Sequence, residues 1–216
     1  MDTILEAFRS IDTATASDAL DRLGIEGGCL GIRQIVTGTR AVGRAATVRY
    51  RPFNKVGKPN NIDFLDEVQP GQIAVLDNGA REYCSVWGDI MTAHAIARGV
   101  AGTVIDGVCR DIPKMRELNY PMFSRGSFMH TGKDRVETDA VNVPVTLGQR
   151  RVCPGDIVIA DDTGVVIVPA SKAEEVIAIA REIEEAEAAI IELISIGKTL
   201  REAREIHGYY SLQTKK

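Results

Sequence analysis

One segment of the chain, residues 71–109, passes from an apolar strand pattern through a helical pattern to a second apolar strand pattern. "GQIAVLDN" is rich in the residues of buried strands and is expected to end near Asn78, before a loop over residues 79–88. Asp89 then stands where a helix N-cap belongs, and Gly99 ends that helix before the strand "GTVIDG". A strand–helix–strand unit has parallel strands joined by a right-handed crossover. The segment therefore predicts an α/β fold around a mainly parallel sheet.

The same unit predicts which residues meet. A helix of roughly ten residues covers about 15 Å, and a strand of about five residues returns a similar distance. Asp89 and the pair Arg110–Asp111, which lie twenty residues apart, are thus expected at one edge of the sheet. Ligands of open α/β sheets usually bind in the crevice beyond the carboxyl ends of the strands.

The residue types at this edge suit an anionic, oxygen-rich ligand. Gly88 and the free backbone N–H groups of Ile90 and Met91, at a helix N-terminus, favour a carboxylate. Arg110 offers a planar fork for a carboxylate or an enolate oxygen. Asp111, with Asp89 acting through water, would hold a hard cation such as Mg²⁺. The alternative interpretation is that Asp89 only caps a helix and that Arg110–Asp111 form only a surface ion pair in a turn.

The pattern "GD…A…G..G.V.DG..RD" around Asp89, Arg110 and Asp111 resembles a known family signature, Asp-x20-Arg-Asp. "SDALDRLG" from Ser17, "PGDIVIADDTGVVIVP" from Pro154 and the acidic C-terminal helix are similar to the same family. It includes the 4-hydroxy-4-methyl-2-oxoglutarate / 4-carboxy-4-hydroxy-2-oxoadipate aldolases and the regulators of ribonuclease E activity A.

The resemblance implies a three-layer β/β/α swivelling-domain-like fold and a homotrimer or homohexamer with sites between subunits. It implies that Asp111 ligates Mg²⁺ or Mn²⁺, that Asp89 holds the metal through water, and that Arg110 binds the oxo-acid end of the substrate. It also implies a glutamate from a neighbouring subunit, for which the cluster 182–187, and within it Glu185, is the candidate.

The expected activity is that of a divalent-metal-dependent class II aldolase, which cleaves 4-hydroxy-2-oxo acids to pyruvate and a second carbonyl compound. Oxaloacetate decarboxylation passes through the same enolate and is expected too. A Schiff-base aldolase is the rival mechanism, but Lys55, Lys58 and Lys114 stand in loop or polar contexts. The alternative function is that of a non-catalytic trimeric regulator that binds another protein, as the ribonuclease E regulators do.

Composition excludes several other classes. The 216 residues are 44% hydrophobic and 26% charged, with a formal net charge of −4 and a pI near 5.5. There is no basic excess for nucleic acid and no apolar run that approaches the roughly 20 residues needed to span a membrane. The N-terminus lacks a secretory signal pattern, and the four cysteines are scattered, which favours reduced thiols in a cytoplasmic protein.

The remaining sequence predicts an α/β catalytic domain over residues 1–170 and a C-terminal helical arm over residues 171–216. Near the N-terminus we expect helices at 3–8 and at 17–23, the second capped by Ser17, then a strand at 40–51 and a loop at 51–61. Two Pro-Gly turns precede strands, and 165–168 closes a hairpin. The arm is predicted to hold a long helix, with the apolar stripe Val176, Ile179, Ile183, Ala186 and Ile190, and a second helix at 199–206 that ends at Gly208.

Other candidate residues carry less. His94, His130 and His207 lack the spacing of a zinc site and are interpreted as structural or surface residues. Trp87 and Tyr83, close before Asp89, could line the pocket or simply pack.

Overall fold

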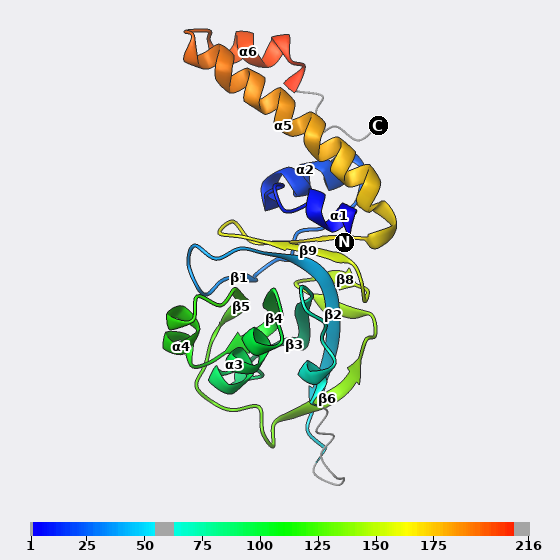
Figure 1. The fold of residues 1–216 in the computed structure, drawn as a ribbon, viewed down its shortest axis with the longest axis vertical. Coiled ribbons are helices and arrows are strands. Elements are labelled where there is room, and N and C mark those ends of the chain that lie inside the picture. The colour runs from blue at the N-terminus through cyan, green and yellow to red at the C-terminus, as the bar shows by residue number, and fades with distance from the viewer. Residues whose placement is uncertain (1, 55–62, 210–216) are drawn as a thin grey trace.

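The structure, a computed structural model, describes residues 2–54 and 63–209. A sheet-rich body carries a group of helices at one end, from which a long helical arm projects (Figure 1). The fold is mixed α/β with a mostly parallel central sheet that curves nearly into a barrel. The predicted fold class is confirmed.

The described residues form helices, 3₁₀ turns and strands. The helices are α1 (Thr3–Ala7), α2 (Thr13–Arg22), α3 (Asp89–Ala97), α4 (Ile112–Glu117), α5 (Ala173–Ser195) and α6 (Leu200–Ile206), with 3₁₀ turns η1 (Phe64–Asp66) and η2 (Ala170–Lys172). The strands are β1 (Arg33–Gln34), β2 (Ala41–Pro52), β3 (Ile73–Ser85), β4 (Gly102–Cys109), β5 (Met122–Ser127), β6 (Val136–Val141), β7 (Val145–Leu147), β8 (Arg150–Val152), β9 (Ile157–Ala160) and β10 (Val165–Val168).

The sheet has the order β1-β5-β4-β3-β2-β9-β10, and β6 also pairs with β2. The inner pairs β2–β3, β3–β4 and β4–β5 are parallel, whereas the outer pairs are antiparallel. Helix α3 connects β3 to β4, so the predicted strand–helix–strand unit with parallel strands is confirmed. The predicted hairpin that ends at 165–168 is β9–β10.

Strand β3 is longer than expected. It continues to Ser85 instead of ending near Asn78 before a loop over residues 79–88. The pairing with β4 runs regularly to Asp77 opposite Asp106, then resumes at Arg81 opposite Gly107 and at Ser85 opposite Val108. The extra residues of β3 leave the ladder as bulges, which Gly79 assists with a φ of 57°. The bulges need turn-forming residues such as Gly79, and these residues made the segment resemble a loop in the sequence.

Two predicted helix starts were wrong in detail. Helix α2 begins at Thr13, because the carboxylate of Asp12 accepts a hydrogen bond from the Thr15 N–H and caps the helix ahead of Ser17. Asp89 is the first residue of α3, and the N-cap is Gly88. The two Pro-Gly turns are present, with φ of 81° at Gly71 and 85° at Gly155.

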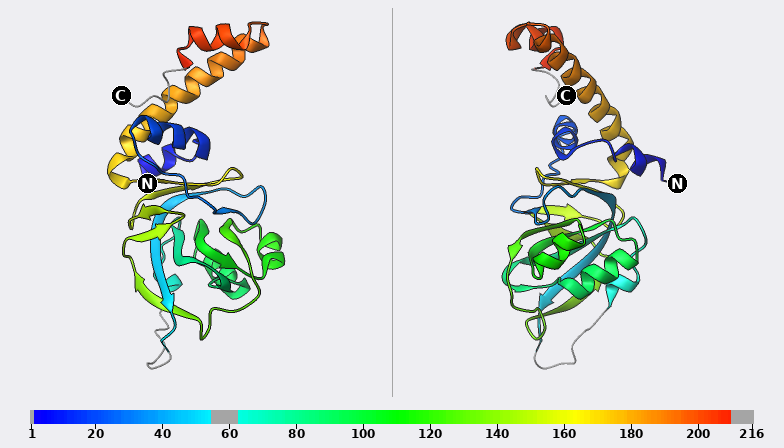
Figure 2. Two further views of the ribbon diagram at one scale, coloured as in Figure 1. Left: turned by 180° about the vertical axis from the view of Figure 1, so that it is seen from behind. Right: turned by 60° about the vertical axis from the view of Figure 1, so that its left-hand side comes forward.

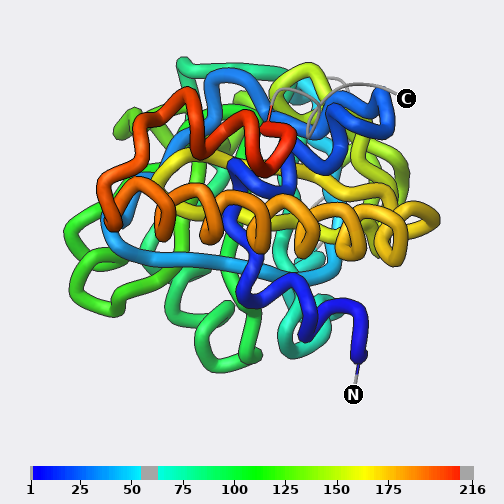
Figure 3. Tube along the Cα trace, turned by 90° about the horizontal axis from the view of Figure 1, so that it is seen from above, coloured from blue at the N-terminus to red at the C-terminus, as the bar shows by residue number. Residues whose placement is uncertain are grey.

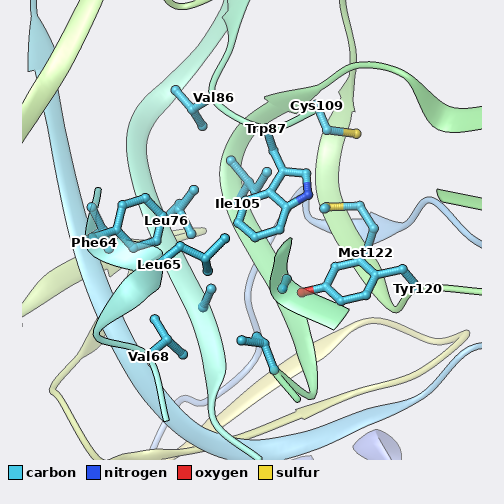
Figure 4. Close-up of a cluster of buried hydrophobic side chains, with 14 of the residues drawn as sticks. Phe64, Leu65, Val68, Leu76, Val86, Trp87, Ile105, Cys109, Tyr120 and Met122 are labelled. Atoms are coloured by element: carbon cyan, nitrogen blue, oxygen red, sulfur yellow. The ribbon is translucent and has the colours of Figure 1, made fainter. Parts of the chain in front are cut away.

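Apolar side chains alternate between the two faces of the sheet and create separate layers. Ala74 and Leu76 of β3 face a cluster shared with the helical side, whereas Ile73 and Val75 face the β7–β8 and β9–β10 hairpins. These two clusters form the β/α and β/β contacts of the three-layer arrangement. Figure 4 shows part of the first cluster, where the rings of Trp87 and Tyr120 stack with centroids 6.1 Å apart.

The arm joins the body through a third cluster. Its long helix α5 buries Val176, Ile183 and Ile190 of the predicted stripe, while Ile179 and Ala186 are only half-buried. The cluster includes side chains of α1, α2, β9 and β10. The distal part of α5 extends past these helices (Figure 2), and α6 runs back alongside it (Figure 3). Helix α6 starts after the Thr199 cap, and Gly208 follows it with a φ of 61°.

Some predictions fall partly or wholly outside these elements. The loop expected at 51–61 was wrong at its start, because β2 continues through Pro52, and residues 55–62 lie outside the described part of the chain. The four cysteines are free thiols, three of them buried. Among the described residues, no helix is both long and apolar enough to cross a membrane.

Candidate functional site

A cleft of about 780 Å³ opens beside the start of α3, at the carboxyl ends of β3 and β4. One wall follows the chain from Ser85 to Met91 and includes Arg110. The facing wall is built by β2, η1, β6 and the loop before β6. The cleft therefore lies where the sequence pattern predicted a ligand crevice.

The two halves of the sequence signature meet here. The backbone N–H of Asp89 donates to Oδ2 of Asp111 at 3.2 Å, and Nε of Arg110 lies 3.3 Å from the same oxygen. Arg110 and Asp111 remain partly open to solvent, with side-chain exposures of 40% and 37%. The side chains of Arg110 and Asp111 are thus adjacent and accessible, and the backbone of Asp89 contacts the same carboxylate.

Asp111 has an unusual backbone conformation. Its φ of 60° and ψ of 36° lie in the left-handed region, which non-glycine residues enter only where the surroundings hold them. In this conformation Oδ2 lies directly over Gly88, where a Cβ atom would come within 2.6 Å of it. Gly88 therefore leaves room for the carboxylate of Asp111.

The helix N-terminus differs from expectation in one respect. The N–H of Ile90 was predicted to be free, but it donates to Oδ1 of Asp89 at 2.8 Å. A side chain at the first helical position can reach back to the neighbouring N–H, and so the carboxylate of Asp89 already serves as the anion at this helix end. Ile90 and Met91 both line the cleft.

The carboxylates of Asp111 and Asp89 suit a divalent cation that has few protein ligands. Within the described ranges, no three His, Cys, Asp or Glu side chains are grouped to hold a metal ion. Mg²⁺ keeps several waters and requires only one or two protein carboxylates, which Asp111 and Asp89 would supply. The exposure of Asp111 leaves space for those waters.

Two predicted aromatic residues behave differently from each other. Trp87 lines the cleft but is buried, with 2% of its surface exposed. Tyr83 is 52% exposed and lies outside the cleft lining. His94 lines the cleft and lies 2.7 Å from Asp66, so it is a surface histidine with a carboxylate partner.

The candidate lysines and glutamates are elsewhere. Lys114 of α4 pairs with Glu117 at 2.8 Å, and Lys55 and Lys58 lie outside the described residues. The cluster 182–187 is on α5, and none of the described residues that line the cleft comes from this helix. Burial raises the pKa of Glu184 and Glu187, and the nearby Asp12 adds to both effects.

Sequence reasoning missed the facing wall. It includes the residues Tyr50, Phe64 and Glu137, among others. Glu137 is buried and pairs with Arg51 at 3.0 Å. Burial raises the pKa of Tyr50, opposed by a hydrogen bond with Thr138. These residues share no local motif, and the pairing of β2 with β6 is what brings Tyr50 and Glu137 together.

Fold and site together define an α/β protein with a polar ligand cleft at the carboxyl end of a parallel sheet. The sequence profile of the RraA-like family, described as Aldolase/RraA, matches residues 13–167. The chain belongs to this family, and the predicted resemblance is confirmed.

Relatives point to both branches of the family. Protein DlpA of Legionella pneumophila is 36% identical over 97% of this chain, which spans only 34% of that protein's length. A Halalkalibacterium halodurans protein named "Putative 4-hydroxy-4-methyl-2-oxoglutarate aldolase" is 32% identical, over 79% of this chain and 78% of its own. The crystal structure of Streptomyces coelicolor RraAS2, titled an unusual member of the RNase ES inhibitor RraA protein family, has a TM-score of 0.81 at 32% identity and covers 87% of this chain and 95% of its own.

Proposed function

We propose that this protein is a divalent-metal-dependent class II aldolase that cleaves 4-hydroxy-2-oxo acids to pyruvate and a second carbonyl compound. One observation carries the proposal: the backbone N–H of Asp89 and the guanidinium of Arg110 both contact one carboxylate oxygen of Asp111 at the edge of an open cleft. The name of the Halalkalibacterium relative, which is that of an aldolase, supports the same reaction class.

Each residue has a distinct role in this proposal. Asp111, with Asp89 through water, would hold Mg²⁺ or Mn²⁺, which would polarise the oxo group of the substrate. Arg110 would bind the oxo-acid end, since its guanidinium matches two oxygens at once. Gly88 and the N–H groups of Ile90 and Met91 would face the substrate carboxylate. For Ile90 this requires the carboxylate of Asp89 to release its N–H, because the two are bonded in the free protein.

The reaction balances without a further reactant. A water held by the site's carboxylates takes the proton of the 4-hydroxyl group, and the C3–C4 bond breaks to form the second carbonyl compound. The bonding electrons pass to C3 and its neighbouring oxo group, which become the enolate of pyruvate. Arg110 stabilises the growing oxygen charge, and the proton that the water took from the 4-hydroxyl group is returned to C3, which completes pyruvate.

Oxaloacetate decarboxylation is proposed as a side activity. Loss of CO₂ from oxaloacetate leaves the same enolate, so the groups that stabilise one reaction stabilise the other. The facing wall, with Tyr50, Phe64 and Glu137, would contact the departing fragment of the aldol substrate and would matter less for CO₂.

We further propose that the working form is a homotrimer or homohexamer and that a glutamate of a neighbouring subunit, Glu185 being the candidate, completes each site. Residues 1–170 would be the catalytic domain, and the helical arm over 171–216 would either belong to the same domain or pack on a neighbouring subunit. Three buried, free cysteines support a reducing, cytoplasmic location.

The test is an assay of pyruvate release from a panel of 4-hydroxy-2-oxo acids and from oxaloacetate, with and without EDTA. Release that EDTA abolishes and added Mg²⁺ or Mn²⁺ restores is the expected result. Absence of release from every substrate with metal present, or release that EDTA leaves unchanged, would contradict the proposal.

The second candidate is a non-catalytic regulator that binds another protein. Its supporting observation is the similarity to RraAS2, whose title places it in a ribonuclease-inhibitor family. Such a role does not require Asp89, Arg110 and Asp111 to converge in a cleft. This candidate would be favoured if the protein releases no pyruvate from any substrate but inhibits a purified ribonuclease of the E type.

A further inference from the structure

A chain of buried hydrogen bonds lies directly behind the cleft. The indole Nε1–H of Trp87 donates to the hydroxyl of Thr92 at 2.9 Å, and that hydroxyl donates to the carbonyl of Gly88 at 2.9 Å. The backbone N–H of Thr92 donates to the same carbonyl at 3.1 Å. Trp87 is 2% exposed and Thr92 is fully buried, so water does not compete for these bonds.

Trp87 also contacts the other half of the signature. Its backbone carbonyl accepts a hydrogen bond from the N–H of Arg110 at 3.0 Å. Its ring stacks on Tyr120 within the apolar cluster (Figure 4), and the Tyr120 hydroxyl lies 2.8 Å from the hydroxyl of Thr103. Trp87 thus connects the core with both ends of the signature, through its side chain at Thr92 and through its backbone carbonyl at Arg110.

Gly88 needs such a restraint. It has no side chain, and its extended backbone, with φ of −149° and ψ of −163°, is held by no packing of its own. Its carbonyl orientation sets the direction of the next peptide, which carries the Asp89 N–H. That N–H donates to Asp111.

We propose that Trp87 and Thr92 are positioning residues that fix the Gly88–Asp89 peptide and thereby the carboxylate of Asp111. Both side chains are buried, and their hydrogen-bonding atoms are paired within the protein. The effect on peptide order follows from geometry alone, whereas the effect on turnover rests on the proposed aldolase function.

Thr103 provides a matched control. Like Thr92, it is a fully buried threonine, and its hydroxyl is hydrogen-bonded to the hydroxyl of Tyr120, whose ring stacks on Trp87. Unlike Thr92, it lies on β4 and has no hydrogen bond to Gly88. Replacing either threonine by valine removes one buried hydroxyl without changing the size of the side chain. A purely structural role predicts equal consequences for the two variants.

The experiment compares Thr92→Val, Thr92→Ser, Thr103→Val and Trp87→Phe in the full chain. Hydrogen–deuterium exchange measured by mass spectrometry reports on the peptide 86–92, calorimetry on Tm, and pyruvate release on kcat/KM. We expect Thr92→Val to raise exchange in this peptide and to lower kcat/KM, each about tenfold, as expected for one lost buried hydrogen bond. Thr92→Ser keeps the hydroxyl and should resemble the wild type.

Thr103→Val should lower Tm by an amount similar to Thr92→Val, while exchange in the peptide 86–92 and kcat/KM stay unchanged. Trp87→Phe keeps a stacked ring but loses the N–H donor, so it should raise exchange and lower kcat/KM as Thr92→Val does. If Thr92→Val does not fold, Trp87→Phe decides the question. Unchanged exchange at 86–92, equal effects of both valine variants, or raised exchange with full activity would each overturn the inference. If the wild type releases no pyruvate, the aldolase proposal fails, and the exchange comparison still decides whether Trp87 and Thr92 order the peptide.

Discussion

The backbone N–H of Asp89 donates to the carboxylate of Asp111 at 3.2 Å, across a separation of 22 residues. This bond joins the start of α3 to the chain that leaves β4. The bond uses the backbone of Asp89, while Oδ1 of its side chain accepts a hydrogen bond from the N–H of Ile90. Three predictions concern this relationship directly, and two concern the stability and assembly of the protein.

Asp111 should be indispensable for metal binding. Asp111→Ala removes the carboxylate that contacts both Arg110 and the Asp89 N–H at the edge of the cleft, and no group of three potential metal ligands among the described residues could compensate. We expect pyruvate release to fall to background while the circular dichroism spectrum is unchanged. A Mn²⁺ titration should show binding to the wild type and none to the variant; equal binding by both would place the metal elsewhere.

Arg110 should contribute most when charge develops on the substrate. Arg110→Ala is expected to lower kcat/KM on the order of 10²-fold or more, as for a lost oxyanion donor, and Arg110→Lys should recover only part. Oxalate resembles the pyruvate enolate, and its binding can be followed through Trp87, the one tryptophan of the chain. With Mg²⁺ present, oxalate should change the emission of the wild type but not that of Arg110→Ala. An equal response would show that the guanidinium does not contact the ligand.

Gly88 should tolerate no side chain. In Gly88→Ala the new Cβ would lie 2.6 Å from Oδ2 of Asp111, so the carboxylate must move. We expect at least a tenfold loss of kcat/KM with little change in Tm. The control is Gly28→Ala, because a Cβ at Gly28 would meet nothing within 4 Å. Activity in Gly88→Ala equal to that of the control would mean that the carboxylate position is unimportant.

Asp161 should make stability depend on pH in the acid range. Burial alone would raise its pKa, but hydrogen bonds from the N–H and hydroxyl of Thr13 and from the N–H of Thr163 hold the pKa below the ordinary 3.8. A lowered pKa stabilises the folded state above the unfolded-state value and loses this effect as pH falls through the folded-state value.

Asp161→Asn should therefore lower Tm at pH 7, and its deficit should shrink below about pH 3.8. The exposed Asp21→Asn serves as the control and should show no such deficit. Calorimetry between pH 2.5 and 7 checks this; a deficit of constant size would show that the hydrogen bonds do not distinguish the two protonation states.

Assembly should involve the distal arm. Ile191 and Ile196 near the end of α5 are 67% and 72% exposed, and Leu200 and Ile206 of α6 are also open to solvent. Sedimentation velocity should show a trimer or hexamer, and Ile191→Glu with Ile196→Glu should shift it toward smaller species. Glu192→Gln, on the same surface, is the control. A monomer with full activity at micromolar concentration would contradict the proposal of shared sites.

Local sequence signals predicted those parts of the fold that depend on local chemistry. The parallel strands around α3 followed from one stretch of sequence, and the convergence of Asp89 with Arg110 and Asp111 followed from element lengths. The start of α2 was wrong because two acceptable caps, Asp12 and Ser17, lie close together and tertiary contacts choose between them. Thr13, the residue after the chosen cap, bonds to the distant Asp161.

The facing wall of the cleft could not be predicted in this way. Tyr50 and Glu137 come from strands that are far apart in sequence and pair antiparallel with a register shift beside Tyr50. Neither strand contains a sequence motif that indicates which strand it pairs with. Likewise, the hydrogen bond between Trp87 and Thr92 depends on the rotamers of two buried side chains, which the residue types alone do not determine.

The bulged part of β3 has a consequence for how the chain can change in length. Between the pairs Asp77–Asp106 and Ser85–Val108, β3 has several residues more than β4, and they leave and rejoin the sheet without displacing Ser85. An insertion beside Gly79 would enlarge this excursion, whereas one extra residue between Asp89 and Arg110 would turn the helix or shift the strand and separate the charged groups. The exposed turn at Gly79 and Ala80 is therefore the place to introduce an epitope or a reporter while the spacing of the site stays intact.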